Sequence, residues 1–214
     1  MKASVLELMM IVLSLSEEAL DDIITKASGV LNSGGIVVYP TESFYALGVF
    51  ADCEQALKNL YELKGRPVDK PLPLIVGDME ILLSVVKNIP DSARGLMERF
   101  WPGPLTLVFE AKESVSNLLT AGTGKVAVRV PGDSTALYLA RRLGGPVTAT
   151  SANPSAKPPA ETAGEVVRYF GESVDMIIDA GRTPGGKPST IVDVTVVPLR
   201  ILREGRVSLH TSRV

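Results

Sequence analysis

The sequence contains a single cysteine, Cys53, and a single histidine, His210, in 214 residues. A lone cysteine forms no internal disulfide, which is typical of a reducing compartment, and we expect a cytoplasmic location. His210 stands in a polar segment near the last residue, whereas Ser-His-Asp or Cys-His catalysis needs a histidine beside a nucleophile. No group of His, Cys, Asp and Glu has zinc-ligand spacing, so we expect no metal site built from protein residues.

The chain also lacks a long hydrophobic run and an excess of charge of one sign. The apolar stretch from Val5 to Leu15 is interrupted by Glu7, has no small-x-small cleavage site and is too short to span a bilayer. We interpret it as a buried first strand and expect no membrane association. The formal net charge of -2 excludes a globally basic nucleic-acid coat, so any polyanion site must be a local concentration of Lys and Arg.

What is present is the composition of a globular protein. Hydrophobic residues make up 45% and charged residues 21% of the chain, and the 19 glycines and 15 prolines are scattered rather than clustered. No internal repeat or linker divides the sequence. We therefore expect one domain over residues 1–214, with a motif-bearing core over about 30–206.

Helical and strand patterns alternate along the chain, and the last strands follow one another without helices between them. This arrangement predicts an α/β domain with a twisted, mixed parallel and antiparallel sheet and flanking helices. Capping patterns place helix starts at Ser14 and Asp133, among others. The predicted helices cover 14–31, 52–64, 78–86, 90–101, 133–143 and 161–170, and the predicted strands cover 36–39, 72–76, 105–109, 126–130, 146–147, 176–178, 190–194 and 199–202.

Two glycine-rich strings resemble nucleotide-binding motifs but fail their structural requirements. The string from Gly181 to Lys187 begins like a P-loop, but Pro188 replaces the Ser or Thr that would bind magnesium, and a strand rather than a helix follows. Gly122-Thr-Gly124 precedes a strand, whereas a dinucleotide fingerprint follows one. Both strings are predicted to form turns.

The remaining candidates are cations and hydroxyls at the ends of elements. Lys64-Gly65-Arg66-Pro67 places two cations where a helix stops, although cations at a helix end also simply complement the helix dipole. Arg129 ends a buried strand. Thr150-Ser151-Ala152-Asn153 follows another strand, and its polar groups suit either a turn or contacts to ribose and phosphate.

Taken together and in order, these segments resemble the YrdC-like family of threonylcarbamoyl-AMP synthases. The resemblance extends from Ile36 to Arg206 and implies a twisted α/β sheet with a concave cationic cavity. It also implies condensation of L-threonine, bicarbonate and ATP into threonylcarbamoyl-AMP with release of pyrophosphate. The matching segments are Pro40-Thr41-Glu42-Ser43, Lys64-x-Arg66-Pro67, Pro102-Gly103-Pro104-x-Thr106, Val128-Arg129-x-Pro131, Thr150-Ser151-Ala152-Asn153 and Ser189-Thr190-Ile191-Val192-Asp193.

The resemblance also implies roles for individual residues. Lys64 and Arg66 are expected to stabilise the negative charge of the triphosphate. ATP is expected to be a substrate and to bring its magnesium ion with it. The expected ATP-binding residues are Lys64, Arg66, Val68, Lys125, Ser151, Asn153 and Arg203. The expected threonine-binding residues are Thr41, Arg129, Ala149 through its backbone, and Ser189.

Two positions depart from the family pattern: Ser43 stands where threonine is usual, and Ala156 where glycine is usual. We expect the single-domain form of the family, without the C-terminal domain of longer relatives. Its implied partner is a separate enzyme that transfers the threonylcarbamoyl group to tRNA. The alternatives are a non-catalytic module for double-stranded RNA or tRNA, a structural or regulatory domain, and a carbamoyl-transfer domain.

Overall fold

The computed structural model describes residues 10–209, so His210 and the first part of the predicted strand from Val5 lie outside the described residues. Strand β1 (Ile11–Ser14) forms as expected but is not buried. Ile11 and Val12 are 42% and 46% exposed, because β1 is the edge strand of its sheet and pairs with β9. The prediction of a buried first strand was therefore wrong in its burial.

The strands form two mixed sheets rather than the single sheet predicted. One sheet has the order β1-β9-β2-β3-β8, and the other has the order β11-β10-β5-β6-β4-β7. Both contain parallel and antiparallel pairs, so the mixed character is confirmed. Besides β1, the strands are β2 (Val37–Pro40), β3 (Tyr45–Gly48), β4 (Leu74–Ile75), β5 (Leu105–Glu110), β6 (Lys125–Arg129), β7 (Val147–Thr148), β8 (Thr150–Ser151), β9 (Met176–Asp179), β10 (Thr190–Asp193) and β11 (Arg200–Arg203).

At Ala149 the chain passes directly from a strand of one sheet to a strand of the other. The preceding strand, β7, pairs with β4, and the following strand, β8, pairs with β3. The Ala149 amide donates to the carbonyl of Pro73 at 2.8 Å, and the Thr148 amide donates to the carbonyl of Val49 at 3.0 Å. A sequence pattern does not reveal such a crossing, because both short strands are equally extended.

The helices begin and end close to the predicted places, with two corrected starts. Ser14 is paired in β1, so α1 begins only at Leu20. The cap of α6 is Ser134, whose side chain accepts from the Leu137 amide, rather than Asp133. The helices are α1 (Leu20–Asn32), α2 (Glu54–Lys64), α3 (Met79–Val85), α4 (Asp91–Phe100), α5 (Asn117–Thr120), α6 (Thr135–Leu143) and α7 (Ala163–Phe170); α5, β3 and β8 were not predicted.

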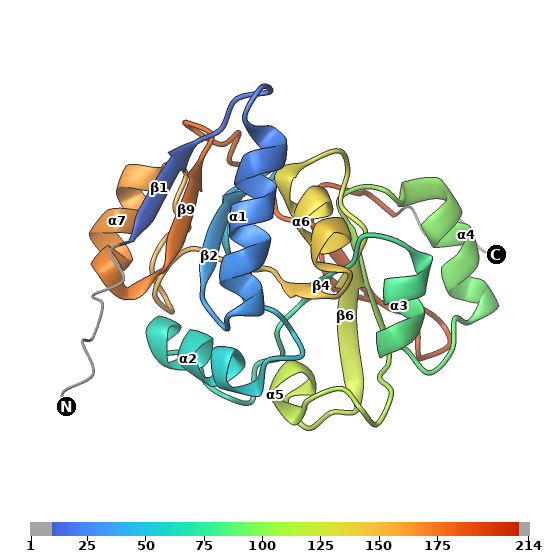
Figure 1. Ribbon diagram of the computed structural model, residues 1–214. Helices are drawn as coiled ribbons and strands as arrows, with labels where there is room; N and C mark the ends of the chain where they lie inside the picture. The colour runs from blue at the N-terminus through green and yellow to red at the C-terminus, as the bar shows by residue number, and fades with distance from the viewer. Residues whose placement is uncertain (1–9, 210–214) are drawn as a thin grey trace.

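The central strands β2 and β3 of the first sheet are buried on both faces, which explains their continuous apolar sequences. Along β2, Val37 and Tyr39 pack against α1 and α6, which lie side by side (Figure 1). Val38, which points to the other face, belongs to the larger core that α2 also contacts. The strand alternation therefore places apolar side chains in two cores at once. None of the helices within residues 10–209 is long and apolar enough to cross a membrane.

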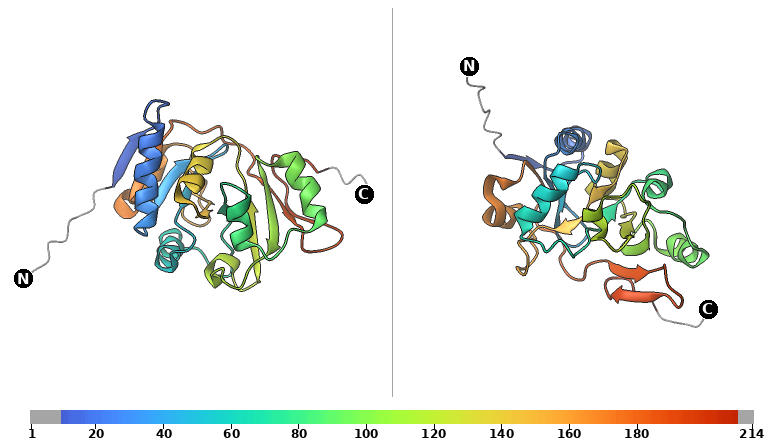
Figure 2. Two further views of the ribbon diagram at one scale, coloured as in Figure 1. Left: turned by 45° about the vertical axis from the view of Figure 1, so that its right-hand side comes forward. Right: turned by 90° about the horizontal axis from the view of Figure 1, so that it is seen from below.

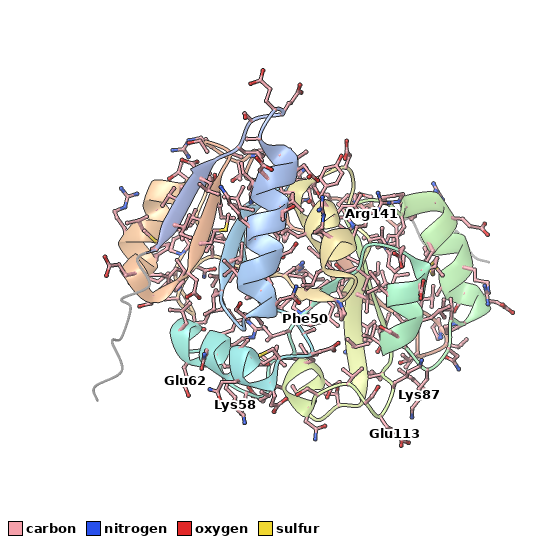
Figure 3. All side chains as sticks on the ribbon, viewed as in Figure 1. Phe50, Lys58, Glu62, Lys87, Glu113 and Arg141 are labelled. Carbon is pink, nitrogen blue, oxygen red and sulfur yellow. The ribbon has the colours of Figure 1, made fainter. Side chains whose placement is uncertain are left out.

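Helix α2 carries a lysine on its buried face. Leu57, Leu60 and Tyr61 are buried at helical spacing, and Lys64 continues the same stripe one turn later. Lys58 and Glu62 lie on the outer side of α2 (Figure 3). The helical spacing that places Leu57, Leu60 and Tyr61 in the core therefore also directs the Lys64 side chain inward.

Candidate active site

Lys64 is the most deeply buried of the predicted site residues that carry a charge, with 3% of its surface exposed. Its ammonium group donates to the main-chain carbonyl of Asn153 at 2.7 Å and to that of Ser151. Burial, followed by the positive charge of Arg66, lowers the pKa of Lys64 to about 8. The carbonyl oxygens accept hydrogen bonds from the ammonium group but carry no net charge. The positive charge of Lys64 is therefore available to an anionic ligand.

The loop that follows β8 is folded around Lys64. The Ser151 hydroxyl donates to the Asn153 side-chain oxygen. The Asn153 amide group donates to the carbonyls of Pro154 at 2.9 Å and Lys157 at 2.7 Å. The Ser155 amide donates to the Lys64 carbonyl at 2.8 Å. Ser151 and Asn153 are thus held at fixed positions beside the buried cation.

Arg66 lies just beyond the end of α2, where Gly65 adopts a left-handed conformation with φ of 55°. Its guanidinium donates to the carbonyls of Lys70 at 3.1 Å and Pro71 at 2.8 Å. These bonds orient Arg66 toward the turn after the helix rather than the helix carbonyls. Val68 lies in the same turn and is 65% exposed.

A second group of cations, which we call the arginine cluster, consists of Arg129, Arg203 and Arg206. Arg129 ends β6 with its side chain 10% exposed, and it forms an ion pair with Glu42. Burial lowers the pKa of Arg129 to about 10, and the positive charges of Arg203 and Arg206 add to this shift. The electrostatic interaction with Tyr39 raises the pKa of Arg129 and so opposes the shift, and the guanidinium is charged at neutral pH.

Ser189, predicted to bind threonine, is hydrogen-bonded to Arg203, which was predicted to bind ATP. Arg203 Nη2 donates to the Ser189 carbonyl at 2.9 Å and to its hydroxyl at 3.1 Å. The Ser189 hydroxyl also shares a hydrogen bond of 2.9 Å with that of Thr106 on β5. Because β10 and β11 form an antiparallel hairpin at the sheet edge (Figure 2), Arg203 at the end of β11 lies beside the start of β10.

Thr41 lies in the turn between β2 and β3, directly before Glu42, the ion-pair partner of Arg129. Its hydroxyl donates to the Phe44 carbonyl at 2.7 Å and accepts from the amides of Ser43 and Phe44 at 3.2 Å. Ser43 donates through its own hydroxyl to the Lys187 carbonyl at 3.1 Å. Thr41 therefore shapes the turn that presents Glu42 to Arg129.

Two predicted residues have partners outside these groups. Lys125 is at the opposite end of β6 from Arg129 and pairs with Asp193 at 2.9 Å. The amide of Ala149 is bonded to Pro73. Within residues 10–209, no three His, Cys, Asp or Glu side chains are grouped so as to hold a metal ion.

Three residues to which the sequence assigned no role lie beside the predicted ones. Arg206 donates to the carbonyls of Lys187 at 3.0 Å and Gly185 at 2.9 Å, and so fastens the glycine-rich loop before β10. Glu42 and Thr106 were both within matching segments. Their position within these segments could have identified them as site residues. No local sequence pattern marks Arg206.

The fold and the cation groups define an α/β protein with two basic groups at strand and helix ends, each built around a buried cation (Lys64 or Arg129) and suited to anionic small molecules. Residues 29–205 match the family model Sua5_yciO_yrdC, described as telomere recombination. The chain therefore belongs to the Sua5/YciO/YrdC family.

Relatives with a similar sequence carry a common name. The threonylcarbamoyl-AMP synthase of Pyrococcus abyssi is 40% identical over 94% of this chain and 59% of the relative. That of Idiomarina loihiensis is 42% identical over 74% of this chain and 87% of the relative. A crystal structure of P. abyssi Sua5 complexed with L-threonine superimposes with a TM-score of 0.85 at 40% identity, covering 92% of this chain and 57% of that protein. This chain thus spans less than two thirds of the Pyrococcus relative.

Proposed function

We propose that this protein condenses L-threonine, bicarbonate and ATP into threonylcarbamoyl-AMP and releases pyrophosphate. The observation that carries the proposal is the presence of two basic groups, each built around a buried cation, in a member of the Sua5/YciO/YrdC family. The buried cations are Lys64, held by its loop, and Arg129 of the arginine cluster. The names of the relatives and the threonine complex of the Pyrococcus protein support it.

The reaction suits a site that is rich in cations. The threonine amine takes up carbon dioxide as a carbamate, and a carbamate oxygen then attacks the α-phosphorus of ATP while pyrophosphate leaves. All the reactants are anionic or become so, and catalysis can rest on positioning and charge stabilisation. This agrees with a set of described site residues dominated by Lys, Arg and hydroxyl groups.

We assign the residues to two subsites of the proposed reaction. Lys64, Arg66, Ser151, Asn153 and Arg203 bind ATP, with Val68 and Lys125 as further nucleotide-binding candidates, and magnesium arrives with the nucleotide. Thr41, Arg129, Ala149 and Ser189 bind threonine, and the Arg129 guanidinium is a natural fork for its carboxylate. The Arg203–Ser189 bond at 2.9 Å would couple the two subsites.

The product is an activated carbamate, and we propose that a separate enzyme transfers its threonylcarbamoyl group to tRNA in the cytoplasm. The test of the whole assignment is pyrophosphate release by the purified protein, with mass detection of threonylcarbamoyl-AMP. Release should require both threonine and bicarbonate. Equal release without threonine would mean that the protein is a plain ATPase, and no release with salt-sensitive tRNA binding would favour an RNA-binding module.

A further inference from the structure

Glu42 is the carboxylate that neutralises Arg129 in this structure. The ion pair is largely shielded from water, with 10% of the Arg129 side chain and 29% of the Glu42 side chain exposed. Among residues 10–209, neither Arg203 nor Arg206 forms an ion pair with a carboxylate. Glu42 is therefore the one described anion that is ion-paired with the arginine cluster.

The position of Glu42 is fixed by its neighbours on both sides. Thr41 closes the turn with three hydrogen bonds from its hydroxyl. The Ser43 carbonyl accepts from the Gly185 amide at 2.7 Å, and its hydroxyl donates to the Lys187 carbonyl. The turn is thus fastened to the loop that Arg206 also holds. A carboxylate held in this way is preorganised and does not depend on a flexible side chain alone.

A buried cation beside a partly buried anion is the electrostatic complement of an amino-acid zwitterion. When a free carboxylate alone displaces Glu42 from Arg129, one ion pair replaces another and a displaced carboxylate is left near the incoming one, which is unfavourable. When a zwitterion enters, its carboxylate pairs with Arg129 and its ammonium pairs with Glu42. One ion pair becomes two, and no like charges are left facing each other.

We propose that Glu42 is a specificity-determining residue that binds the α-ammonium group of the amino-acid substrate while Arg129 binds its carboxylate. This inference rests on the proposed function and adds to it the selection of α-amino acids over other carboxylates. The contact also places the amine at a defined distance from the carboxylate fork. Glu42 thus positions the substrate nitrogen that must form the carbamate.

The test is the preference of the protein for L-threonine over (R)-3-hydroxybutyrate, which is threonine without its amino group. Both ligands are titrated by calorimetry into the wild-type protein, Glu42→Gln and Asp21→Asn. The last variant is a matched control that removes the exposed Asp21–Arg142 ion pair. Circular dichroism and thermal unfolding check that each variant is folded.

We expect the wild-type protein and the control to prefer threonine by roughly 10-fold or more, the value of one charge-assisted hydrogen bond. In Glu42→Gln this preference should fall at least 10-fold, because threonine loses its ammonium contact while 3-hydroxybutyrate loses a competitor for Arg129. An unchanged preference, with both ligands tighter or both unaffected, would overturn the inference. So would equal binding of the two ligands by the wild-type protein, a result that needs no folded variant.

Different results would refute the proposed function and the role of Glu42. Wild-type protein that neither binds threonine nor releases pyrophosphate in its presence would refute the proposed function itself. Wild-type protein that binds threonine, with the same ligand preference in Glu42→Gln, would refute only the role of Glu42. As a further arm, 1-aminopropan-2-ol, which has the ammonium but no carboxylate, should bind Glu42→Gln more weakly than the wild-type protein.

Discussion

The ammonium nitrogen of Lys64 lies 2.7 Å from the carbonyl oxygen of Asn153, and it also donates to Ser151. Lys64 is 87 and 89 residues away from Ser151 and Asn153 in the sequence, and all three were predicted to bind ATP. Their contact means that the cation is fixed by main-chain carbonyls, which unlike carboxylates do not cancel its charge. A buried charge arranged in this way is a strong candidate for stabilising a transition state.

We expect Lys64→Ala to lower the turnover of pyrophosphate release by roughly 10²-fold or more, as for other preorganised electrostatic groups. Lys58→Ala is the matched control, since Lys58 lies on the exposed side of the same helix (Figure 3). If Lys64 only complemented the helix dipole, the two variants would behave alike. Steady-state kinetics on folded proteins, checked by circular dichroism, distinguishes the two cases.

The pKa of Lys64, lowered to about 8 by burial and by the charge of Arg66, predicts a pH dependence. In the free enzyme the cation is lost as the pH rises through 8, so kcat/KM for ATP should fall above that pH with a one-proton slope. Lys64→Arg, which keeps its charge, should lack this alkaline limb. A wild-type profile that stays flat up to pH 9.5 would contradict the prediction.

The same shift has a consequence for stability. Between the pKa of about 8 in the folded protein and the ordinary 10.5 in the unfolded chain, the unfolded chain binds more protons at Lys64. The Lys64 contribution to the free energy of unfolding should therefore increase as the pH rises through this window. Urea denaturation of the wild-type protein and Lys64→Met at pH 7.5 and 9.5 isolates the effect, which Lys64→Met should not show.

Arg129→Lys keeps the charge at the end of β6 but loses the planar fork. We expect the affinity for threonine to weaken by about 1.5–3 kcal/mol, the range for a charge-assisted hydrogen bond. ATP binding should change little, and calorimetry with each ligand measures both. Arg142→Lys, in an exposed ion pair with Asp21, serves as the control. Unchanged threonine binding together with weaker, salt-sensitive tRNA binding would assign Arg129 to RNA phosphate instead.

Ala156 occupies the position where the family usually has glycine, and its φ is 67°. A left-handed conformation costs a residue with a Cβ roughly 1–2 kcal/mol, while glycine gains about 0.4–1 kcal/mol of entropy in the unfolded chain. We therefore expect Ala156→Gly to raise the free energy of unfolding by up to about 1 kcal/mol. Ala127→Gly, within β6, should instead lower it by about 0.5–1 kcal/mol. Chemical denaturation compares the two.

Gly205, two residues after β11, packs closely against the chain segment that leads into β10. A Cβ there would lie 2.3 Å from the Pro188 carbonyl oxygen and 2.5 Å from the Ser189 carbonyl carbon. We expect Gly205→Ala to destabilise the protein by about 1–3 kcal/mol and to weaken threonine binding, because Arg203 and Ser189 are forced apart. Gly95→Ala, in α4 with open space around it, should leave binding unchanged and slightly raise stability.

Most of the secondary structure could be predicted because it depends on local periodicity. The strand at 36–39 and the ends of α2 and α6 at Gly65 and Gly144 follow from apolar runs and left-handed glycines. The errors occurred where tertiary pairing overrides a local signal. Ser14 is paired with Asp179 in a sheet and therefore caps no helix. Strand β3 forms by pairing with β2, and β8 forms by pairing with β3.

The sequence by itself determined the alternation of elements and the residue types that bring charge to their ends. It also placed Lys64 on the apolar stripe of α2, since helical spacing alone directs that side chain inward. Only the tertiary structure decided which charges meet. Arg129 and Glu42 are 87 residues apart, and Lys64 and Asn153 are 89 apart. Such contacts depend on how strands pair and where the chain crosses between sheets, and no local pattern of residues encodes that geometry.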